Sequence, residues 1–332
     1  MRGGGNNMKK IVEIFICMLF IFTILPASAN IIVDRTYDST ISGNTLYVGG
    51  SGPGNYTRIQ DAIDNASDGD TVFVYHGFYS DFSPDNYTCV MIAKKIALIG
   101  EDKRTTIIDG TASNFCGIYV RADNVMITGF TIQNARIGIF TPSGSDVLNV
   151  IVHDTIITEN PTGLFIGSVS NGEFYNNIIS YSSYCGIEIQ GLHGGIVHNN
   201  SISNNRWAIY MSSGKNIIEY NDIKNNEIGI FFYGREAEIR CNNFIKNKID
   251  AKGHGGYYLR DFIRNPRVLF FQQKCEKNYW DMHIALLPKP IFAIVTISIT
   301  IWRFGSYTIG VFPSIQFDWH PAKEPYDIPE PT

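Results

Sequence analysis

The sequence has little charge and few cysteines. Only 17% of its 332 residues are charged, against about 25% in typical soluble domains. A formal net charge of -4 leaves no basic footprint, so nothing predicts a nucleic-acid partner. No two of the six cysteines lie at C-x-x-C spacing, which argues against a zinc or redox motif. The hydrophobic content of 44% excludes a disordered chain.

Long hydrophobic runs are also missing. A membrane-spanning helix needs about 20 apolar residues, but the run from Ile11 to Leu25 is shorter and contains Glu13. Basic residues precede it and Ala27-Ser28-Ala29 follows, a pattern typical of a secretory signal. We therefore expect residues 1–29 to be a cleaved signal and the protein to be secreted, periplasmic or at the cell surface. An uncleaved membrane anchor is the alternative. Glycosylation sequons fit export and lie at Asn55, Asn65, Asn86 and Asn199.

Five cysteines remain after the signal. An odd number without paired spacing does not predict a disulfide framework, so we expect buried thiols at Cys89, Cys116, Cys185, Cys241 and Cys275.

Between Ile127 and Ala251 the chain repeats itself every 21 to 24 residues. Short apolar pieces, separated by Asn or Gly, are too short for helices. Four positions recur. An apolar file reads Ile127, Ile151, Phe174, Val197, Ile218 and Ile239; a polar file reads Asp154, Asn177, Asn200, Asn221 and Asn242; a second apolar file reads Ile132, Ile156, Ile179, Ile202, Ile223 and Phe244; and a file of small residues reads Gly138, Gly163, Gly186, Ala208 and Gly229.

Such copies can bury their apolar side chains only by stacking on one another. Parallel strands about 4.8 Å apart place like residues above one another, so each Asn can bond the Asn of the next coil. We predict an all-β fold, a parallel β-helix of roughly nine coils over residues 71–281. Residues 30–70 would form an N-terminal segment whose helix, Ile59 to Asn65, caps the open end. Residues 282–332 would form a C-terminal cap, with a β-hairpin from Ile291 to Phe317, and a proline-rich tail.

Several segments resemble known families. The stretch YTRIQDAIDNASDGDTVFVYHGFY, from Tyr56 to Tyr79, resembles the start of exported right-handed β-helix proteins of the pectin-lyase-like superfamily. The Asn-x-Ile and Gly-Ile coils resemble NosD-type repeats, also grouped as a carbohydrate-binding and sugar-hydrolase domain. Asn278-Tyr279-Trp280 and the segment from Phe317 to Pro329 are similar to the end of NosD-like proteins. The resemblance implies a right-handed, single-stranded solenoid, in families that include lyases, hydrolases, epimerases and non-enzymes.

On a β-helix the outward-facing files are available for function. The residue after each Gly-Ile step should point outward, and this file is mostly aromatic. Aromatic rings offer flat faces to sugar rings, which predicts a polysaccharide-binding strip; rings stacked only on one another under a loop are the alternative. The strip consists of Tyr119, Phe140, Phe165, Glu188, Tyr210 and Phe231, flanked by Arg121 and Gln190.

A second outward file contains His198, Glu219 and Arg240 on consecutive coils. At about 5 Å spacing these side chains can pair with one another as a ladder of ions or form an acid–base cluster.

Motifs for catalysis and metals are sparse. Gly253-His254-Gly255 matches one element of a polygalacturonase-like site without the paired Asp residues, and we expect it to form a turn. Glu188 stands alone, without the carboxylate cluster of a Ca²⁺-dependent lyase. Copper would need converging His and Met ligands, and neither calcium nor copper has a supporting motif. The candidate copper donors are scattered at His76, His153, His193, His198, Met282, His283 and His320.

We therefore expect an exported β-helix protein that binds, or processes, cell-surface or extracellular polysaccharide, with motifs that lean against catalysis. If it is an enzyme, polysaccharide lyase, glycoside hydrolase and epimerase are the classes that the resemblance implies. The alternatives are a NosD-like periplasmic accessory in the maturation of nitrous oxide reductase, a copper enzyme, and a non-catalytic structural surface protein. Membrane contact would arise only through an uncleaved signal or the apolar C-terminal cap.

Overall fold

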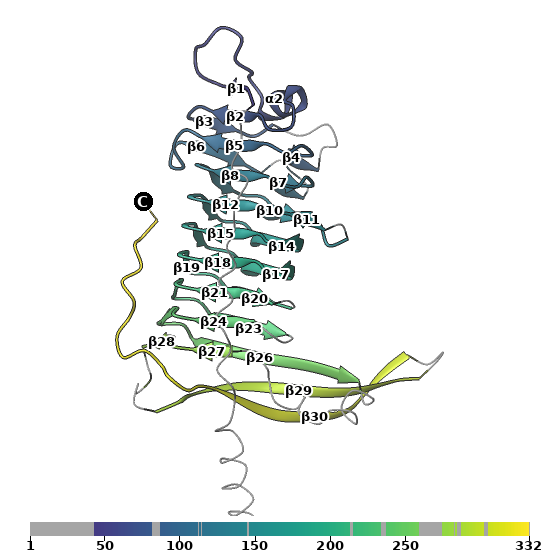
Figure 1. The fold of residues 1–332 in the computed structure, drawn as a ribbon, viewed down its shortest axis with the longest axis vertical. Helices are drawn as coiled ribbons and strands as arrows, with labels where there is room; N and C mark the ends of the chain where they lie inside the picture. Colours follow the sequence, from purple (N-terminus) through teal and green to yellow (C-terminus); the bar gives the residue numbers. More distant parts are fainter. Residues whose placement is uncertain are drawn as a thin grey trace, which may run out of the picture. The chain divides into compact units, whose positions relative to one another are not determined.

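The protein is a stack of β-coils. Its structure, a computed structural model, describes residues 43–81, 87–111, 113, 115–144, 146–212, 215–233, 237–258, 274–281, 283, 287–301 and 305–331. The signal expected at residues 1–29 lies outside this range. In the described part, the chain forms a parallel β-helix of nine coils, as the repeat predicts. Each coil gives one strand to each of three sheets (Figure 1).

The first sheet begins at the N-terminal end of the stack. Its strands are β1 (Thr45–Val48), β2 (Thr71–Val74), β5 (Ala97–Gly100), β8 (Met126–Thr128), β12 (Ile151–His153), β15 (Glu173–Tyr175), β18 (Ile196–His198), β21 (Ile217–Glu219), β24 (Glu238–Arg240) and β27 (Lys274–Glu276).

The second sheet is the shortest. Its strands are β3 (Gly77–Tyr79), β6 (Thr106–Asp109), β9 (Thr131–Gln133), β13 (Ile156–Thr158), β16 (Ile178–Ser180), β19 (Ser201–Ser203), β22 (Asp222–Lys224), β25 (Asn243–Ile245) and β28 (Tyr279–Trp280).

The third sheet ends in an antiparallel pair, β29 with β30. Its strands are β4 (Thr88–Ile92), β7 (Cys116–Val120), β10 (Ile137–Thr141), β14 (Thr162–Ser170), β17 (Cys185–His193), β20 (Trp207–Met211), β23 (Ile228–Tyr233), β26 (Ile249–Tyr258), β29 (Lys289–Ile301) and β30 (Gly305–Asp318), with β11 (Val147–Leu148) paired to β14.

The inward files form one continuous apolar core. The predicted register is correct in every copy but one. In that coil Val152, not Ile151, pairs with Ile127 and Phe174, and Ile157, not Ile156, pairs with Ile132 and Ile179. Adjacent apolar residues at both steps left the sequence pattern unable to separate the two registers, because either choice preserves an apolar file.

The polar file forms a buried ladder of amides. Asn177 donates through Nδ2 to Oδ1 of Asn200 at 3.0 Å, and Asn200 donates to Asn221 at 2.9 Å. The ladder continues through Asn242 to Asn278. Its first member is Thr155 rather than Asp154, since the Thr155 hydroxyl donates to Asn177 Oδ1 at 2.6 Å, in keeping with the one-residue shift of that coil.

The N-terminal end of the stack is capped by α2 (Ile59–Asn65), at the predicted residues. Ile59, Ala62 and Ile63 are buried against the first coils. The Gln60 side chain accepts from the backbone nitrogen of Met91 at 2.8 Å and donates to the Met91 carbonyl at 3.2 Å. Gln60 therefore provides hydrogen-bond partners for backbone groups of β4, which is the edge strand of the third sheet at this end.

The C-terminal end is closed by the β29–β30 hairpin, as predicted. Asp318, at the end of β30, is fully buried and accepts from Asn278 Nδ2 at 3.2 Å and from Trp280 Nε1 at 3.1 Å. A carboxylate thus ends the amide ladder, since it accepts on both oxygens and needs no further acceptor.

Two smaller expectations are settled. All five expected thiols are free and buried. The expectation of a turn at Gly253-His254-Gly255 is wrong, because these residues lie inside β26 and pair with β23 and β29. None of the helices in the described part of the chain has the length and apolarity to cross a bilayer.

Candidate ligand-binding face

The predicted strip is a true file on the outside of the third sheet. Tyr119 pairs with Phe140, Phe140 with Phe165, and Glu188 lies in register between Phe165 and Tyr210. Tyr210 then pairs with Phe231. The five rings are half-buried, and Glu188 is buried. The register extends the file to Met91 at one end and Lys252 at the other.

Glu188 divides the rings into two groups. In the first, the ring centroids of Phe140 and Phe165 stack 5.0 Å apart, and Tyr119 meets Phe140 edge-on at 5.2 Å. In the second, Tyr210 and Phe231 stack 5.7 Å apart. The rings therefore stack on one another, as the alternative interpretation requires, and also keep part of their surface open to solvent.

Three further aromatic residues belong to this face, which the sequence pattern did not identify. Trp207 stacks on Tyr210 at 5.5 Å and on Phe231 at 5.4 Å. Tyr184 packs on Trp207 at 5.2 Å and keeps 39% of its surface exposed. Phe115 meets Phe140 edge-on at 4.8 Å. Trp207 lies three residues before the strip residue of its coil, in a file with Cys185 and Ile228. Phe115 and Tyr184 lie four residues before theirs, in a file interrupted by non-aromatic residues such as Arg136 and Pro161, so neither file gave a repeating signal.

We call the strip, together with the residues three and four positions before it and two positions after it in each coil, the strip face. Arg121 and Gln190 occupy the position two residues after the strip, and both are exposed. The Arg121 guanidinium lies 5.6 Å from the centroid of the Tyr119 ring, within the range of a cation–π contact.

Glu188 places a carboxylate among the rings. It is 7% exposed, and Gln190 Nε2 donates to its Oε1 at 2.6 Å. No other donor within the described ranges bonds this carboxylate, so it retains acceptor capacity for a hydroxyl group of a ligand. Burial, followed by the charge of Glu188, raises the pKa of Tyr184. Burial also raises the pKa of Tyr210, so both phenols are neutral donors at pH 7.

The second predicted cluster lies on the outside of the first sheet. His198, Glu219 and Arg240 are in register on consecutive coils. Arg240 Nε donates to Glu219 at 2.7 Å, whereas His198 bonds Glu173 of the preceding coil at 2.9 Å instead of Glu219. This arrangement is a ladder of paired ions that satisfies its own charges.

A stack of three rings continues that file. Tyr175 lies between His153 and His198, with centroid distances of 4.8 and 5.1 Å and nearly parallel planes. His153 Nδ1 bonds Asp154 at 2.7 Å. The predicted register of this coil was wrong by one residue and so placed His153 outside the file of His198, which is why the stack was not anticipated.

Metal donors do not gather in the part of the chain that the structure describes, where no group of three or more His, Cys, Asp or Glu side chains could hold an ion. His76 bonds Glu101 at 2.8 Å and His283 bonds the Leu287 carbonyl at 2.7 Å, so these two imidazoles serve separate local contacts. Met282, one of the candidate copper donors, lies outside the described residues.

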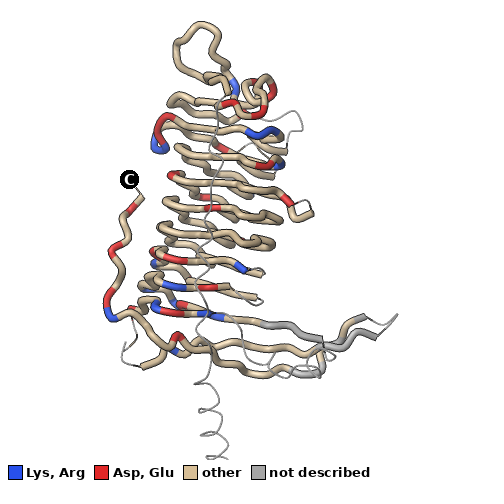
Figure 2. The backbone as a smooth tube through the Cα atoms, in the orientation of Figure 1, with Lys and Arg blue, Asp and Glu red and all other residues tan. Residues whose placement is uncertain are grey.

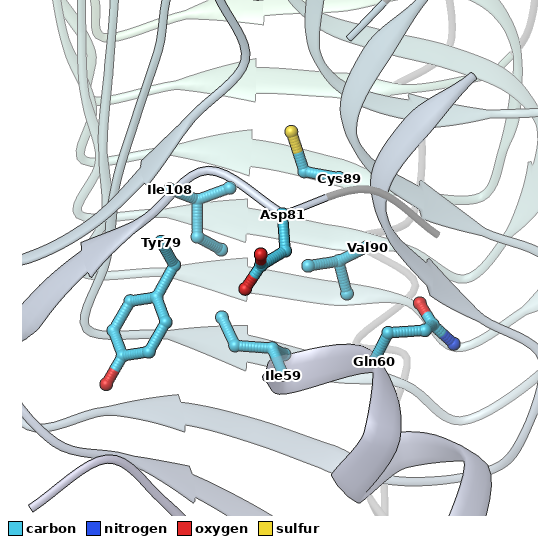
Figure 3. Close-up of a pocket in the computed structure, with 7 residues that line it drawn as sticks. All are labelled: Ile59, Gln60, Tyr79, Asp81, Cys89, Val90 and Ile108. Carbon is cyan, nitrogen blue, oxygen red and sulfur yellow. The ribbon is translucent and has the colours of Figure 1, made fainter. Parts of the chain in front are cut away.

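A small pocket lies beside α2, between the cap and the first coil (Figure 3). Burial raises the pKa of the Cys89 thiol to about 11, so the thiol is protonated and unreactive at neutral pH. The Tyr79 hydroxyl is held by the Tyr75 carbonyl at 2.9 Å. The pocket belongs to the packing of the cap and is lined by Ile59, Gln60, Tyr79, Asp81, Cys89, Val90 and Ile108.

Comparison with known proteins finds one family. The family model described as "Periplasmic copper-binding protein (NosD)" matches residues 63–281, and no curated protein matches. Among solved structures, the chain is similar to pectate lyase Pel9A, with 14% identity, 74% of each chain covered and a TM-score of 0.48. It is similar to the A-module of mannuronan C-5 epimerase AlgE4 from Azotobacter vinelandii, with 16% identity, 63% of this chain and 81% of that chain covered and a TM-score of 0.42. It is also similar to pectin methylesterase PemA from Erwinia chrysanthemi, with 13% identity, 79% of this chain and 84% of that chain covered and a TM-score of 0.43.

Proposed function

The chain belongs to the NosD family, and from this premise we propose that it is an exported, non-catalytic β-helix protein that binds polysaccharide along the strip face. The observation that carries the proposal is the file of half-buried rings, in register over six coils and interrupted by Glu188. Rings that repeat at the strand spacing of about 4.8 Å suit an extended polymer of similar repeat better than a small, compact ligand.

The contacts support a sugar ligand in particular. Partly exposed rings offer apolar area to the C–H faces of sugars, and neutral tyrosine hydroxyls can donate to sugar oxygens. The Glu188 carboxylate, which accepts a hydrogen bond from Gln190 and has acceptor sites left, can accept a hydrogen bond from a sugar hydroxyl. A face that supplies apolar contact, donors and an acceptor together matches the mixed surface of a carbohydrate.

The family name refers to copper, and the residues that the structure describes do not fit a copper site. Copper prefers imidazole, thiolate and thioether donors that converge on one point. In the described part of the chain the cysteines are buried within the coils, while His153 and His198 lie on either side of Tyr175, each bound to its own carboxylate. We therefore derive no copper chemistry for this chain.

The test is a titration of the exported protein with a panel of polysaccharides, followed by calorimetry. We expect Phe165→Ala and Tyr210→Ala each to weaken binding about 2- to 10-fold, since one aromatic contact contributes about 0.5–1.5 kcal/mol. Tyr175→Ala is the matched control, because Tyr175 is also a half-buried, stacked ring but lies on the first sheet. Equal loss in all three variants, or no binding by the unsubstituted protein, would favour a purely structural role.

A further inference from the structure

We infer that the polysaccharide bound by the strip face is anionic, carrying carboxylate or sulfate groups along its length. This inference rests on the proposed function and adds the chemical class of the ligand. It comes from the charges that surround the rings, which the aromatic pattern alone does not reveal.

Charge on the strip face is opposite in sign to that of the whole chain. The chain has a formal net charge of -4, and Figure 2 shows few charged residues on its middle coils. On the strip face, however, five cationic side chains face two carboxylates. The cations are Arg121, Arg136, Arg206, Lys248 and Lys252, and the carboxylates are Glu188 and Glu227.

The two carboxylates do not neutralise this excess. Glu227 lies between Arg206, at 3.8 Å, and Lys248, at 3.9 Å. Glu188 is buried and bonded to Gln190. Arg121, Arg136 and Lys252 have no ion pair with any carboxylate in the described ranges, and the two arginines are exposed. Three cations therefore remain to meet anionic groups of a ligand.

The arginines are placed for recognition beside the rings. Arg121 lies over Tyr119 at 5.6 Å and Arg206 over Trp207 at 5.7 Å. A guanidinium stacked on a ring keeps its N–H groups at the edge, where they can bind a carboxylate or sulfate through two parallel hydrogen bonds. Sugar rings on the aromatic residues and their acidic groups on the adjacent arginines can thus be bound at the same time.

The spacing of the cations requires a polymer. From the coil of Arg121 to the coil of Lys252 there are six strand steps through the third sheet, or about 29 Å at 4.8 Å a step. A single sugar acid cannot reach both ends. Near the middle, the buried charge of Glu188 repels acidic groups, so we expect a hydroxyl of the ligand at that coil and carboxylates or sulfates on either side.

The experiment compares polymers with one backbone, using the full exported chain. Polygalacturonate and its methyl ester share one backbone, and esterification removes the negative charge; dextran sulfate and dextran provide the sulfated pair. We expect an anionic polymer to bind at least about tenfold tighter than its neutral counterpart, with an affinity that falls as NaCl is raised and grows with oligomer length up to the span of the cations. Binding of dextran sulfate, without binding of polygalacturonate, would identify sulfate as the recognised anionic group.

Matched arginine variants distinguish binding at the strip face from non-specific attraction to positive charge elsewhere on the protein. Arg121→Gln with Arg136→Gln should weaken anionic binding about fivefold, while Arg104→Gln, at an exposed arginine remote from the strip face, should leave it unchanged. If the neutral polymers bind as tightly and the arginine variants have no effect, the inference is wrong and polysaccharide binding stands. Equal weakening by Arg104→Gln would also overturn it, as non-specific attraction. If none of the four polymers binds, the proposed function itself fails for this panel, and the inference with it.

Discussion

At the scale of single residues, many corners of the coils meet two structural requirements with two neighbouring residues. The first residue adopts a positive φ and turns the chain, and the second enters a ladder that bonds the next coil. In Asn199-Asn200 the φ of Asn199 is 53°, and Asn200 bonds Asn221. In Asn225-Asn226 the φ of Asn225 is 58°, and Asn226 bonds Asn247. Repeated Asn-Asn pairs are explained by these two separate requirements, since Asn tolerates the left-handed region and carries both a donor and an acceptor.

Some corners place a less suitable residue in the first position. Lys246 has a φ of 53° and precedes the ladder residue Asn247. We predict that Lys246→Asn raises the free energy of unfolding by about 0.5–1 kcal/mol, because Asn accepts this backbone conformation with less strain. Urea unfolding measures the change. Lys246→Ala removes the same charge without the conformational gain, so a comparable rise in that variant would contradict the explanation.

A pH dependence follows from Asp109. Burial alone would raise its pKa, but hydrogen bonds from Gln133, Thr111 and Asn134 outweigh burial and hold the pKa below the ordinary value. The donor distances are 2.8, 3.0 and 2.7 Å. An unfolded aspartate takes up its proton near pH 3.9, above the folded value. The ionised carboxylate therefore stabilises the fold above that pH, and this contribution is lost as the pH falls through the folded pKa.

We accordingly expect Asp109→Asn to be less stable than the unsubstituted protein at pH 7, with a difference that narrows below about pH 4. Unfolding measured from pH 7 to pH 3 tests this, with Glu324→Gln in the exposed tail as the control. A constant difference across the range would show that Asp109 contributes by packing alone.

Residue identity predicted part of the candidate site and not the rest. The outward file from Tyr119 to Phe231 followed from the Gly-Ile step, because an outward position repeats in every coil. Trp207 was missed because its file also contains Cys185 and Ile228, so one aromatic residue made no pattern. His153 was not placed beside Tyr175 and His198, because Ile151 rather than Val152 was assigned to the inward file of its coil.

At the scale of elements, the ends of the stack were predictable because their patterns differ from that of the coils. The helical spacing of Ile59, Ala62 and Ile63 indicated α2, and alternation indicated the hairpin. What the sequence could not supply was how the hairpin meets the last coil. Asp318 closes the amide ladder, although it follows Asn278 by 40 residues, and nothing in its local pattern indicates a buried carboxylate.

We predict that Asp318→Ala lowers the free energy of unfolding by about 3 kcal/mol or more, because it leaves several buried donors unsatisfied. The donors are Asn278 N and Nδ2, Trp280 Nε1 and Lys277 N. Asp318→Asn should cost less, since its amide oxygen still accepts. Chemical unfolding is the measurement, and Asp327→Ala in the exposed tail is the control. Losses equal to that control would rule out a closing role for Asp318.

At the scale of the whole molecule, stability comes from contacts between adjacent coils, each of which repeats the same files. Such a protein approximates a sum of repeat and interface contributions. The ladder residue of one coil therefore has the same environment as that of the next. Removing one coil leaves its two neighbours in contact with each other through the same kinds of side chain. This also explains why the fold was predictable from the repeat although one register was wrong.

Deleting Ser201 to Asn221 tests this additivity. It removes one complete repeat of 21 residues and joins Asn200 to Asp222, which pairs with Ser201 and so occupies the same position one coil later. We expect a folded β-protein with one cooperative transition and a free energy of unfolding lower by about 1–3 kcal/mol. Because Trp207 and Tyr210 leave with the coil, polysaccharide binding should weaken as well. Deleting Ser201 to Tyr210 removes half a coil and puts inward residues out of register, so it should not fold; a stable product from this deletion, or an unfolded one from the first, would contradict the additive description.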